Sequence, residues 1–374
     1  MVLVFIMGGN MLVIENDDLR LIVLSNCKEF GEKVDQRLQE LRGETKSYLV
    51  SIDEVRFNNG EGKMNINETI RNKDVYIISD IGNHSMTYEM FGYKHHMSPD
   101  EHFMDIKRLI SAIRGQASSI SVVMPLLYES RQHRRKGRES LDCALAVQEL
   151  QTLGVKTLIT FDVHDPNIQN AVPCMSFENF YPTHTILESF IEKETLNFDN
   201  LLVVSPDTGA MDRAIYYANM LNTDVGMFYK RRDLTKIVDG KNPIVQHEYM
   251  GKDVKGKNVI VVDDMIASGG SMLEVAEELK KRGASKVYLV ATFALFTSGL
   301  DKFNKAHKDG LFDMLYTTNL TYINPKLKRQ KWFYDVDCSK FLSKIINVLN
   351  RHQSISPLLN GKEEILKLIN DKKK

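Results

Sequence analysis

Cysteines are few in this sequence, and their spacing excludes two classes of small protein. The 374 residues include only Cys27, Cys143, Cys174 and Cys338, which lie far apart and form no CxxC pair. A small disulfide scaffold and a zinc finger both need closely spaced cysteines, so neither fits. Isolated cysteines of this kind are typical of reduced thiols, and we therefore expect a cytoplasmic protein.

Long apolar runs and an excess of charge are missing as well. The longest obvious apolar run, 2–7, falls far below the roughly 20 residues of a membrane helix, and no basic residue precedes it as in a signal peptide. Lysine plus arginine and aspartate plus glutamate both number 49, so the formal net charge is zero. Proteins that bind nucleic acid or anionic membranes generally carry a basic excess. We expect neither kind of partner.

The chain does contain a regular alternation of two apolar patterns. It is 43% hydrophobic, enough for sizeable cores, and at roughly 150 residues per domain its length predicts two domains and an appendage. Several Val- and Ile-rich runs are apolar on both faces, as in a parallel sheet covered by helices, so the sequence predicts an α/β fold. The expected strands are 19–25, 75–79, 121–124, 157–161, 201–205, 225–229, 258–262 and 286–291, and the expected helices are 28–41, 100–116, 141–153, 211–221 and 272–282.

Local signals mark the ends of some elements. Residues 98–101 (SPDE) have the pattern of a capping box with proline in the first helical turn. Gly154 and Gly283 suit left-handed positions at the ends of helices. The stretch 80–101 shows no clear period and predicts a long irregular loop.

The segment 258–271 (NVIVVDDMIASGGS) carries the clearest chemical signal. A buried strand is followed by Asp263 and Asp264, and a turn with two adjacent glycines opens directly into a helix. Glycines let backbone N–H groups approach a phosphate, and a helix N-terminus adds donors and partial positive charge. The acidic pair suits ribose hydroxyls or a hydrated Mg²⁺. The alternative is an ordinary strand–turn–helix junction in which Asp and Ser act only as caps.

This segment resembles the loop that binds phosphoribosyl pyrophosphate (PRPP) in type I phosphoribosyltransferases and PRPP synthetases. Over residues 19–359 the chain resembles the PRPP synthetase (ribose-phosphate diphosphokinase) family, segment by segment and in order. The segments that carry the resemblance are 57–61 (FNNGE), 128–132 (YESRQ) with Arg134, Arg135 and Arg138, 162–165 (DVHD), 204–209 (VSPDTG), 230–232 (KRR) and 347–359.

The resemblance implies a role for each segment. ATP would be bound by Phe57, Asn59, Glu61, Arg131 and Gln132; Mg²⁺ by His164 and Asp207; the ribose phosphate by Asp263, Asp264, Ser268, Gly269, Gly270 and Ser271; and Lys230 and Arg232 would be catalytic. The residue types support one of these roles independently of the resemblance. The chain has no P-loop of the form GxxxxGKS or GxxxxGKT that could bind ATP, and the basic residues of 131–138 suit a triphosphate instead. A solvated basic face, a structural histidine and a simple Asn-Gly turn are the alternatives for 131–138, His164 and 57–61.

The family also implies an architecture and a reaction. We expect two type I phosphoribosyltransferase-like domains, 11–184 on the ATP side and 185–335 on the ribose 5-phosphate side, with a helical segment 336–374 packed back on the first. The reaction would transfer the diphosphoryl group of ATP to the 1-hydroxyl of ribose 5-phosphate, giving PRPP and AMP for nucleotide biosynthesis. Family members form dimers within hexamers that share the ATP site, so we expect a homo-oligomer.

Several positions depart from the family pattern. His133 stands where the family has the aspartate of Arg-Gln-Asp, Ala267 replaces an aspartate of the PRPP loop, Thr292–Phe296 replaces Thr-His-Gly, and 83–102 is longer than the usual connection. A non-catalytic regulatory homologue therefore stays an alternative. A salvage phosphoribosyltransferase that consumes PRPP is the other, although it needs one such domain and no ATP segment.

Overall fold

A computed structural model of the chain describes residues 3–7, 10–14, 18–135, 137–195, 197–232, 244–359 and 361–373, with side chains except at 3–7, 10–14, 230–232 and 244–247. The chain forms two compact units. The first runs to Phe180 and takes in Leu320–Tyr322 and Ser339–Leu359, and the second holds Tyr181–Asn319, Ile323–Cys338 and the last helix. The change of unit at Phe180 lies a few residues before the predicted domain limit at 184/185.

The first unit is built on a five-stranded sheet in which every pair of neighbours is parallel. The strand order is β11-β10-β9-β6-β3, so each successive strand adds to the same side of the sheet. The strands are β3 (Leu19–Val23), β6 (Asp74–Ile78), β9 (Ser119–Val123), β10 (Thr157–Phe161) and β11 (Ser176–Phe180); the helices are α1 (Lys28–Arg42), α2 (Pro99–Ile113), α3 (Asp142–Thr152), α9 (Ser339–Asn350) and α10 (Ser356–Leu359), with 3₁₀ turns at Ser25–Cys27 and Pro166–Ala171.

The second unit is built on a seven-stranded sheet of order β14-β13-β12-β15-β16-β17-β18, parallel except for β14 at its edge. Its strands are β12 (Leu201–Ser205), β13 (Val225–Arg232), β14 (Ile244–Met250), β15 (Asn258–Ile266), β16 (Lys286–Ala294), β17 (Met314–Thr318) and β18 (Phe333–Val336); its helices are α4 (Thr183–Lys193), α5 (Met211–Leu221), α6 (Gly270–Lys281), α7 (Asp301–Lys308), α8 (Pro325–Lys328) and α11 (Lys362–Lys372), with a 3₁₀ turn at Phe198–Asn200.

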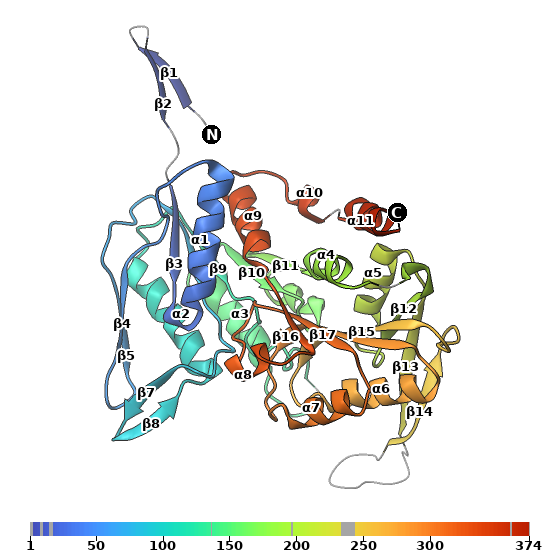
Figure 1. Cartoon of the computed structure of the whole chain (residues 1–374). Coiled ribbons are helices and arrows are strands. Elements are labelled where there is room, and N and C mark those ends of the chain that lie inside the picture. The colour runs from blue at the N-terminus through green and yellow to red at the C-terminus, as the bar shows by residue number, and fades with distance from the viewer. Residues whose placement is uncertain are drawn as a thin grey trace. The chain divides into compact units, whose positions relative to one another are not determined.

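Successive residues of the second sheet enter two separate cores. Val203 and Ile260 pack with residues of α4, α5 and α11, whereas Val204 and Val261 pack with residues of α6 and α7. Figure 1 shows these two groups of helices on opposite faces of the sheet. This burial of both faces explains why the strands read as continuous apolar runs. The predicted α/β fold is confirmed, and all the predicted strands and helices are present, most of them with ends shifted by a few residues.

Local signals at the helix ends are confirmed. The Ser98 side chain accepts a hydrogen bond from the backbone of Glu101, and the Glu101 carboxylate accepts one from the backbone of Ser98, so the capping box is complete. Gly154 and Gly283 follow their helices with φ of 91° and 86°. In the described part of the chain, no helix has both the length and the apolar character needed to cross a membrane.

The prediction of an irregular loop over 80–101 is wrong. This stretch contains an antiparallel hairpin of β7 (Thr87–Met90) and β8 (Tyr93–His96). Its turn places Phe91 and Gly92 at φ of 50° and 80°, which is the backbone of a tight hairpin turn that usually carries Asn-Gly. Because a phenylalanine occupies the first position, the sequence lacks the usual turn signal.

Two further hairpins have no counterpart among the predicted elements. The first joins β1 (Leu3–Met7) and β2 (Asn10–Ile14), and the second joins β4 (Ile52–Arg56) and β5 (Gly62–Ile66). The predicted nucleotide loop 57–61 connects β4 to β5. That predicted loop is therefore presented at the tip of an antiparallel ribbon.

The C-terminal residues divide between the two units. Helix α9 packs on α1, where the Arg42 guanidinium donates to the Asn350 side chain at 2.6 Å. Helix α11 packs on α4 and α5 of the second unit, and its Ile365 and Ile369 are buried there. The expectation that 336–374 packs as one segment on the first domain is therefore wrong for α11.

Candidate functional site

Strands β12 and β15 are parallel neighbours at the point where the winding of the second sheet reverses. From β12 the chain passes through α5 to β13 on one side, and from β15 it passes through α6 to β16 on the other. Two loops, 206–210 and 267–269, therefore diverge at the carboxyl ends of adjacent strands. Open α/β sheets bind ligands in the crevice at such a position.

Three carboxylates from these segments lie close enough to interact. Asp263 and Asp264 stand on β15, and Asp207 follows β12. The strand continues to Ile266, beyond the predicted end at 262, because it pairs with β16 as far as Ala294. The acidic pair therefore lies within the strand, and the loop after it is shorter than the sequence predicts.

Backbone and side-chain contacts fix this acidic pair. The Asp264 backbone N–H donates to Asp263 Oδ1 at 2.9 Å, and Arg213 Nη1 lies 3.9 Å from the same oxygen. Burial raises the pKa of Asp263, the neighbouring Asp264 and Asp207 carboxylates raise it further, and Arg213 opposes them. The site thus holds more negative charge than its own cation neutralises, which favours a cationic or hydroxyl-bearing ligand.

These residues fit Mg²⁺ bound together with a substrate. Among the described residues, no three His, Cys, Asp or Glu side chains gather closely enough to hold a metal by themselves. Mg²⁺ commonly takes one or two carboxylates and fills its remaining positions with water and substrate phosphate oxygens. Asp207 suits this role, because the backbone N–H groups of Gly209 and Ala210 both donate to its Oδ1 and so orient the carboxylate.

The turn after β15 suits a phosphate. Gly269 is the N-cap of α6 at φ 71°, and a Cβ placed there would lie 2.2 Å from the Phe303 ring, so glycine is required. The first turn of α6 contains no acidic residue, and no side chain caps it. Ser268 and Ser271 are exposed beside it. The first N–H groups of a helix have no partner within the helix, so this end suits an anion.

In the first unit, His164 lies beyond the end of β10 in a small polar cluster. Its ring centroid is 5.4 Å from that of His133, and His133 Nε2 lies 3.2 Å from Asp165 Oδ2. Burial raises the pKa of Asp165, but the Asn167 backbone N–H and the nearby His133 lower it more, so the net shift is downward. A carboxylate therefore lies next to His133, that of Asp165, to which the sequence analysis gave no individual role.

The predicted triphosphate segment is exposed. Arg131, Arg134, Arg135 and Arg138 lie on the surface, and Gln132 is partly buried. Just before them, the Tyr128 ring stacks on Phe103 at 4.5 Å, which attaches the start of the segment to α2.

The predicted adenine loop is also exposed at its tip. Phe57 is 48% exposed, and Asn59 and Glu61 are exposed beside it. The Phe57 backbone N–H donates to the Glu61 carbonyl, and the Asn59 amide donates to the Glu61 carboxylate at 3.0 Å. The turn is closed by its own bonds, and the aromatic ring remains open to a ligand.

The predicted catalytic pair is described only by its backbone. Lys230 and Arg232 lie near the end of β13, which pairs with β14 and shifts register between Arg231 and Arg232. Their side chains fall outside the part of the chain that the structure describes. Their catalytic role stays a prediction.

Two residues of the site were not predicted. Arg213 opposes the charge of Asp263 from α5, and Asp165 faces His133 from the turn after β10. The sequence did contain a signal for Asp165, because this acidic residue is present in a chain that has His133 where the family has an aspartate. Arg213 gives no such signal, because a basic residue in the first turns of a surface helix is common.

Comparisons with known proteins agree with this division of the chain. Residues 19–154 match the family model described as the N-terminal domain of ribose phosphate pyrophosphokinase, and residues 184–312 match the phosphoribosyl transferase domain. The ribose-phosphate pyrophosphokinase of Mycoplasmopsis pulmonis is 28% identical to this chain, and the match covers 86% of this chain and 92% of the relative. That of Vibrio parahaemolyticus is also 28% identical, and the match covers 92% of this chain and 99% of the relative. The phosphoribosylpyrophosphate synthetase structure of Mycobacterium smegmatis shares the fold, with TM-score 0.74 and 22% identity over 90% of this chain and 99% of its own.

Substitution of Gly269 and Gly270, one at a time, tests which of the two positions requires glycine. Gly269→Ala should lower the free energy of unfolding by roughly 1–3 kcal/mol, because the new methyl group meets the Phe303 ring in a left-handed backbone. Gly270→Ala is the matched control, because its Cβ would lie 3.9 Å from Ser268 Oγ; its effect should stay within about 0.5 kcal/mol. Urea unfolding measures both, and equal losses would contradict this account of the turn.

Proposed function

The chain belongs to the ribose-phosphate pyrophosphokinase family, and on that premise we propose that it transfers the diphosphoryl group of ATP to the 1-hydroxyl of ribose 5-phosphate, giving PRPP and AMP. One combination carries the proposal. The acidic pair and the helix α6, which begins after Gly269, lie where the winding of the second sheet reverses. In addition, the first unit of the chain matches the family's N-terminal domain. A PRPP-consuming transferase would have no need of that domain.

On the ribose side, different residues bind the 5-phosphate and the ribose hydroxyls. The N–H groups and hydroxyls of Ser268, Gly269, Gly270 and Ser271 bind the 5-phosphate, and the carboxylates of Asp263 and Asp264 accept hydrogen bonds from ribose hydroxyls. Asp264 is 4% exposed, so its orientation is fixed before the sugar binds. Binding groups that are already in place lose little entropy when the ligand arrives.

On the ATP side, Arg131 and Gln132 bind the phosphates, Phe57 stacks on the adenine, and Asn59 and Glu61 bind its polar edge or the ribose. The reactants together carry about six negative charges, which repel each other strongly in a water-poor site. His164 of the first unit and Asp207 of the second would hold Mg²⁺, which would supply neutralising charge. The exposed arginines of 131–138 lower the same repulsion.

The chemical step moves two phosphoryl groups together. The 1-hydroxyl oxygen of ribose 5-phosphate bonds to the β-phosphorus, the bond from that phosphorus to the α,β-bridging oxygen breaks, and AMP leaves with that oxygen while the hydroxyl proton is released. Lys230 and Arg232 stabilise the charge that develops on the transferred group. Catalysis then consists of positioning and electrostatic stabilisation.

The direct assay of this proposal measures AMP. Incubation with ATP, ribose 5-phosphate and Mg²⁺ should yield AMP and PRPP in equal amounts, and removal of Mg²⁺ by EDTA should stop both. Binding of ribose 5-phosphate without any AMP would indicate the regulatory homologue. Consumption of added PRPP in the presence of a purine base would indicate a salvage transferase, and either result would overturn the proposal.

We extend the proposal to the assembly and the compartment. The loop 57–61 stands at the exposed tip of a ribbon, a suitable position for reaching a neighbouring subunit's ATP, and we propose dimers within a hexamer with a shared ATP site. Cys27, Cys143, Cys174 and Cys338 are all free thiols, and burial raises the pKa of Cys143 to about 12. Free thiols are typical of proteins in the reducing cytoplasm, and we propose that compartment for this protein.

Mixing two inactive variants tests the shared site. Glu61→Ala and Lys230→Ala should each lower turnover strongly, because one removes a nucleotide contact and the other a charge that acts in the transition state. After subunits are dissociated and reassembled together, a mixed dimer has one site with both lesions and one with neither, so activity should recover to about a quarter of the wild-type value. With exchange confirmed by native mass spectrometry, activity no greater than the sum of the parents would show a site built within one chain.

A further inference from the structure

The hairpin β7–β8 lies beside the loop 57–61, which the proposed function assigns to ATP. Figure 1 shows β7 and β8 next to the ends of β4 and β5 that carry this loop. The hairpin falls within 83–102, the connection that is longer than usual for the family. A segment that only connects β6 to α2 would not need to form a paired ribbon against a substrate loop.

Two contacts join the hairpin directly to the loop. The backbone N–H of Phe91 donates to the Asn58 carbonyl at 2.9 Å. Gly60 lies under the hairpin, because a Cβ placed there would stand 2.9 Å from Met90 Sδ and 3.5 Å from Tyr88 Oη. With φ of 91°, the Gly60 backbone strains any other residue, and a Cβ there would also displace the Met90 side chain.

A third contact connects the hairpin to the residue just before the loop. The Arg56 guanidinium lies 5.2 Å from the centroid of the Tyr88 ring and pairs with Asp105 of α2 at 2.6 Å. Tyr88 in turn donates its hydroxyl to Glu101 at 2.5 Å, in the first turn of α2. The Arg56 and Asp105 side chains are 13% and 4% exposed, so this pair is shielded from water.

Glu101 brings the base of the hairpin into the same network. It accepts hydrogen bonds from the Ser98 backbone, and His95 Nε2 lies 3.1 Å from it. Burial raises the pKa of Glu101, but the Tyr88, Ser98 and His95 hydrogen bonds together lower it below its usual value. One carboxylate therefore serves both as the cap of α2 and as the anchor of both hairpin strands.

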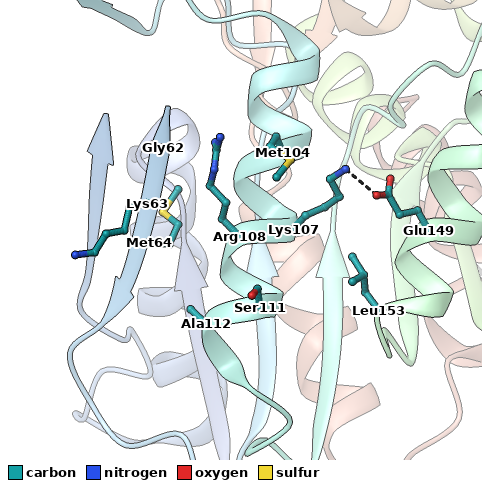
Figure 2. A pocket seen from close by; sticks show the side chains of 10 residues that line it. All are labelled: Gly62, Lys63, Met64, Met104, Lys107, Arg108, Ser111, Ala112, Glu149 and Leu153. Carbon is teal, nitrogen blue, oxygen red and sulfur yellow. Dashed lines mark hydrogen bonds and ion pairs between the residues drawn. The ribbon is translucent and has the colours of Figure 1, made fainter. Parts of the chain in front are cut away.

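Beyond the tip, β5 also borders a pocket. A cavity of about 490 Å³ lies between β5 and helices α2 and α3, bordered by Met64, Met104 and Leu153 (Figure 2). At its upper end, Gly62 lies so close to Arg108 that a Cβ would stand 2.6 Å from its Nη1. β5 also packs on α2, where Met64 is buried, and the contacts at the tip add to this packing in holding the loop.

We propose that the hairpin Thr87–His96 is a positioning element for nucleotide recognition, which holds the loop 57–61 in its binding conformation through Phe91, Met90 and Tyr88. The inference rests on the proposed function only for the identity of the ligand. Removal of the hairpin should release the loop and weaken ATP binding, and should leave the ribose 5-phosphate site of the second unit unchanged. Preorganisation of a loop acts on affinity in this way, because the ordering cost is paid before the ligand binds.

The test replaces 87–96 with two glycines. The Met97 backbone N–H donates to the Met86 carbonyl at 2.9 Å, so the two ends already lie together and the capping box of α2 is retained. Met90→Ala is the milder variant that keeps the fold if the deletion does not. Tyr93→Ser is the matched control, because Tyr93 is 78% exposed on the same hairpin.

Two readouts are taken on each purified full-length protein. In the deletion, and to a smaller degree in Met90→Ala, amide hydrogen exchange across 57–61 should rise about tenfold, with exchange in β15 and α6 unchanged. The KM for ATP should rise about tenfold while the KM for ribose 5-phosphate changes by less than about twofold. Tyr93→Ser should match the wild type in both readouts.

The outcomes separate this inference from the proposed function. Unchanged exchange across 57–61 in both variants would overturn the positioning role whether or not the protein makes AMP. Faster exchange with equal increases in both KM values would overturn it too, because it would show a general loss of structure. A wild-type protein that produces no AMP would overturn the proposed function, and the exchange data would still decide whether the hairpin holds the loop.

Discussion

Burial of both faces of the second sheet is the constraint on which the rest of this unit depends. With α4, α5 and α11 on one face and α6 and α7 on the other, most side chains of the central strands are apolar, and Asp263 and Asp264 lie near the carboxyl end of β15. There the winding reverses between β12 and β15, and the two loops separate. The site occupies the one edge where polar residues, backbone N–H groups and a helix terminus converge.

The charges of the two units complement different parts of the proposed reaction. The second unit has three interacting carboxylates opposed by Arg213, and an uncapped helix end, which together suit a phosphorylated sugar with a cation. The first unit has exposed arginines and a polar cluster around His164, which suit a triphosphate with a cation. The loss of an acidic residue at 133 does not remove a carboxylate from that cluster, because Asp165 lies 3.2 Å from His133. The cluster around His164 thus still contains a carboxylate.

The sequence predicted the buried strands and amphipathic helices well, because their periodicity directly reflects burial. The bounds of β10, β12 and α5 agree with the predictions residue for residue. The hairpin β7–β8 could not be predicted, because its turn carries Phe91 in a left-handed conformation without the usual Asn. The extension of β15 to Ile266 depends on pairing with β16, and the packing of α11 on the second unit depends on tertiary contacts of two isoleucines. Such long-range contacts leave no local pattern.

The central claim is that ATP and ribose 5-phosphate are bound by separate groups of residues, and calorimetric titration of two variants tests it most directly. In the presence of Mg²⁺, His164→Ala should weaken ATP binding about tenfold and change ribose 5-phosphate binding by less than about twofold, because the proposed function assigns this histidine to the metal on the ATP side. Asp264→Ala should do the reverse, because the proposed function assigns its carboxylate to the sugar. Equal losses of both substrates in both variants would contradict the division of the site and merge the two groups of residues into one.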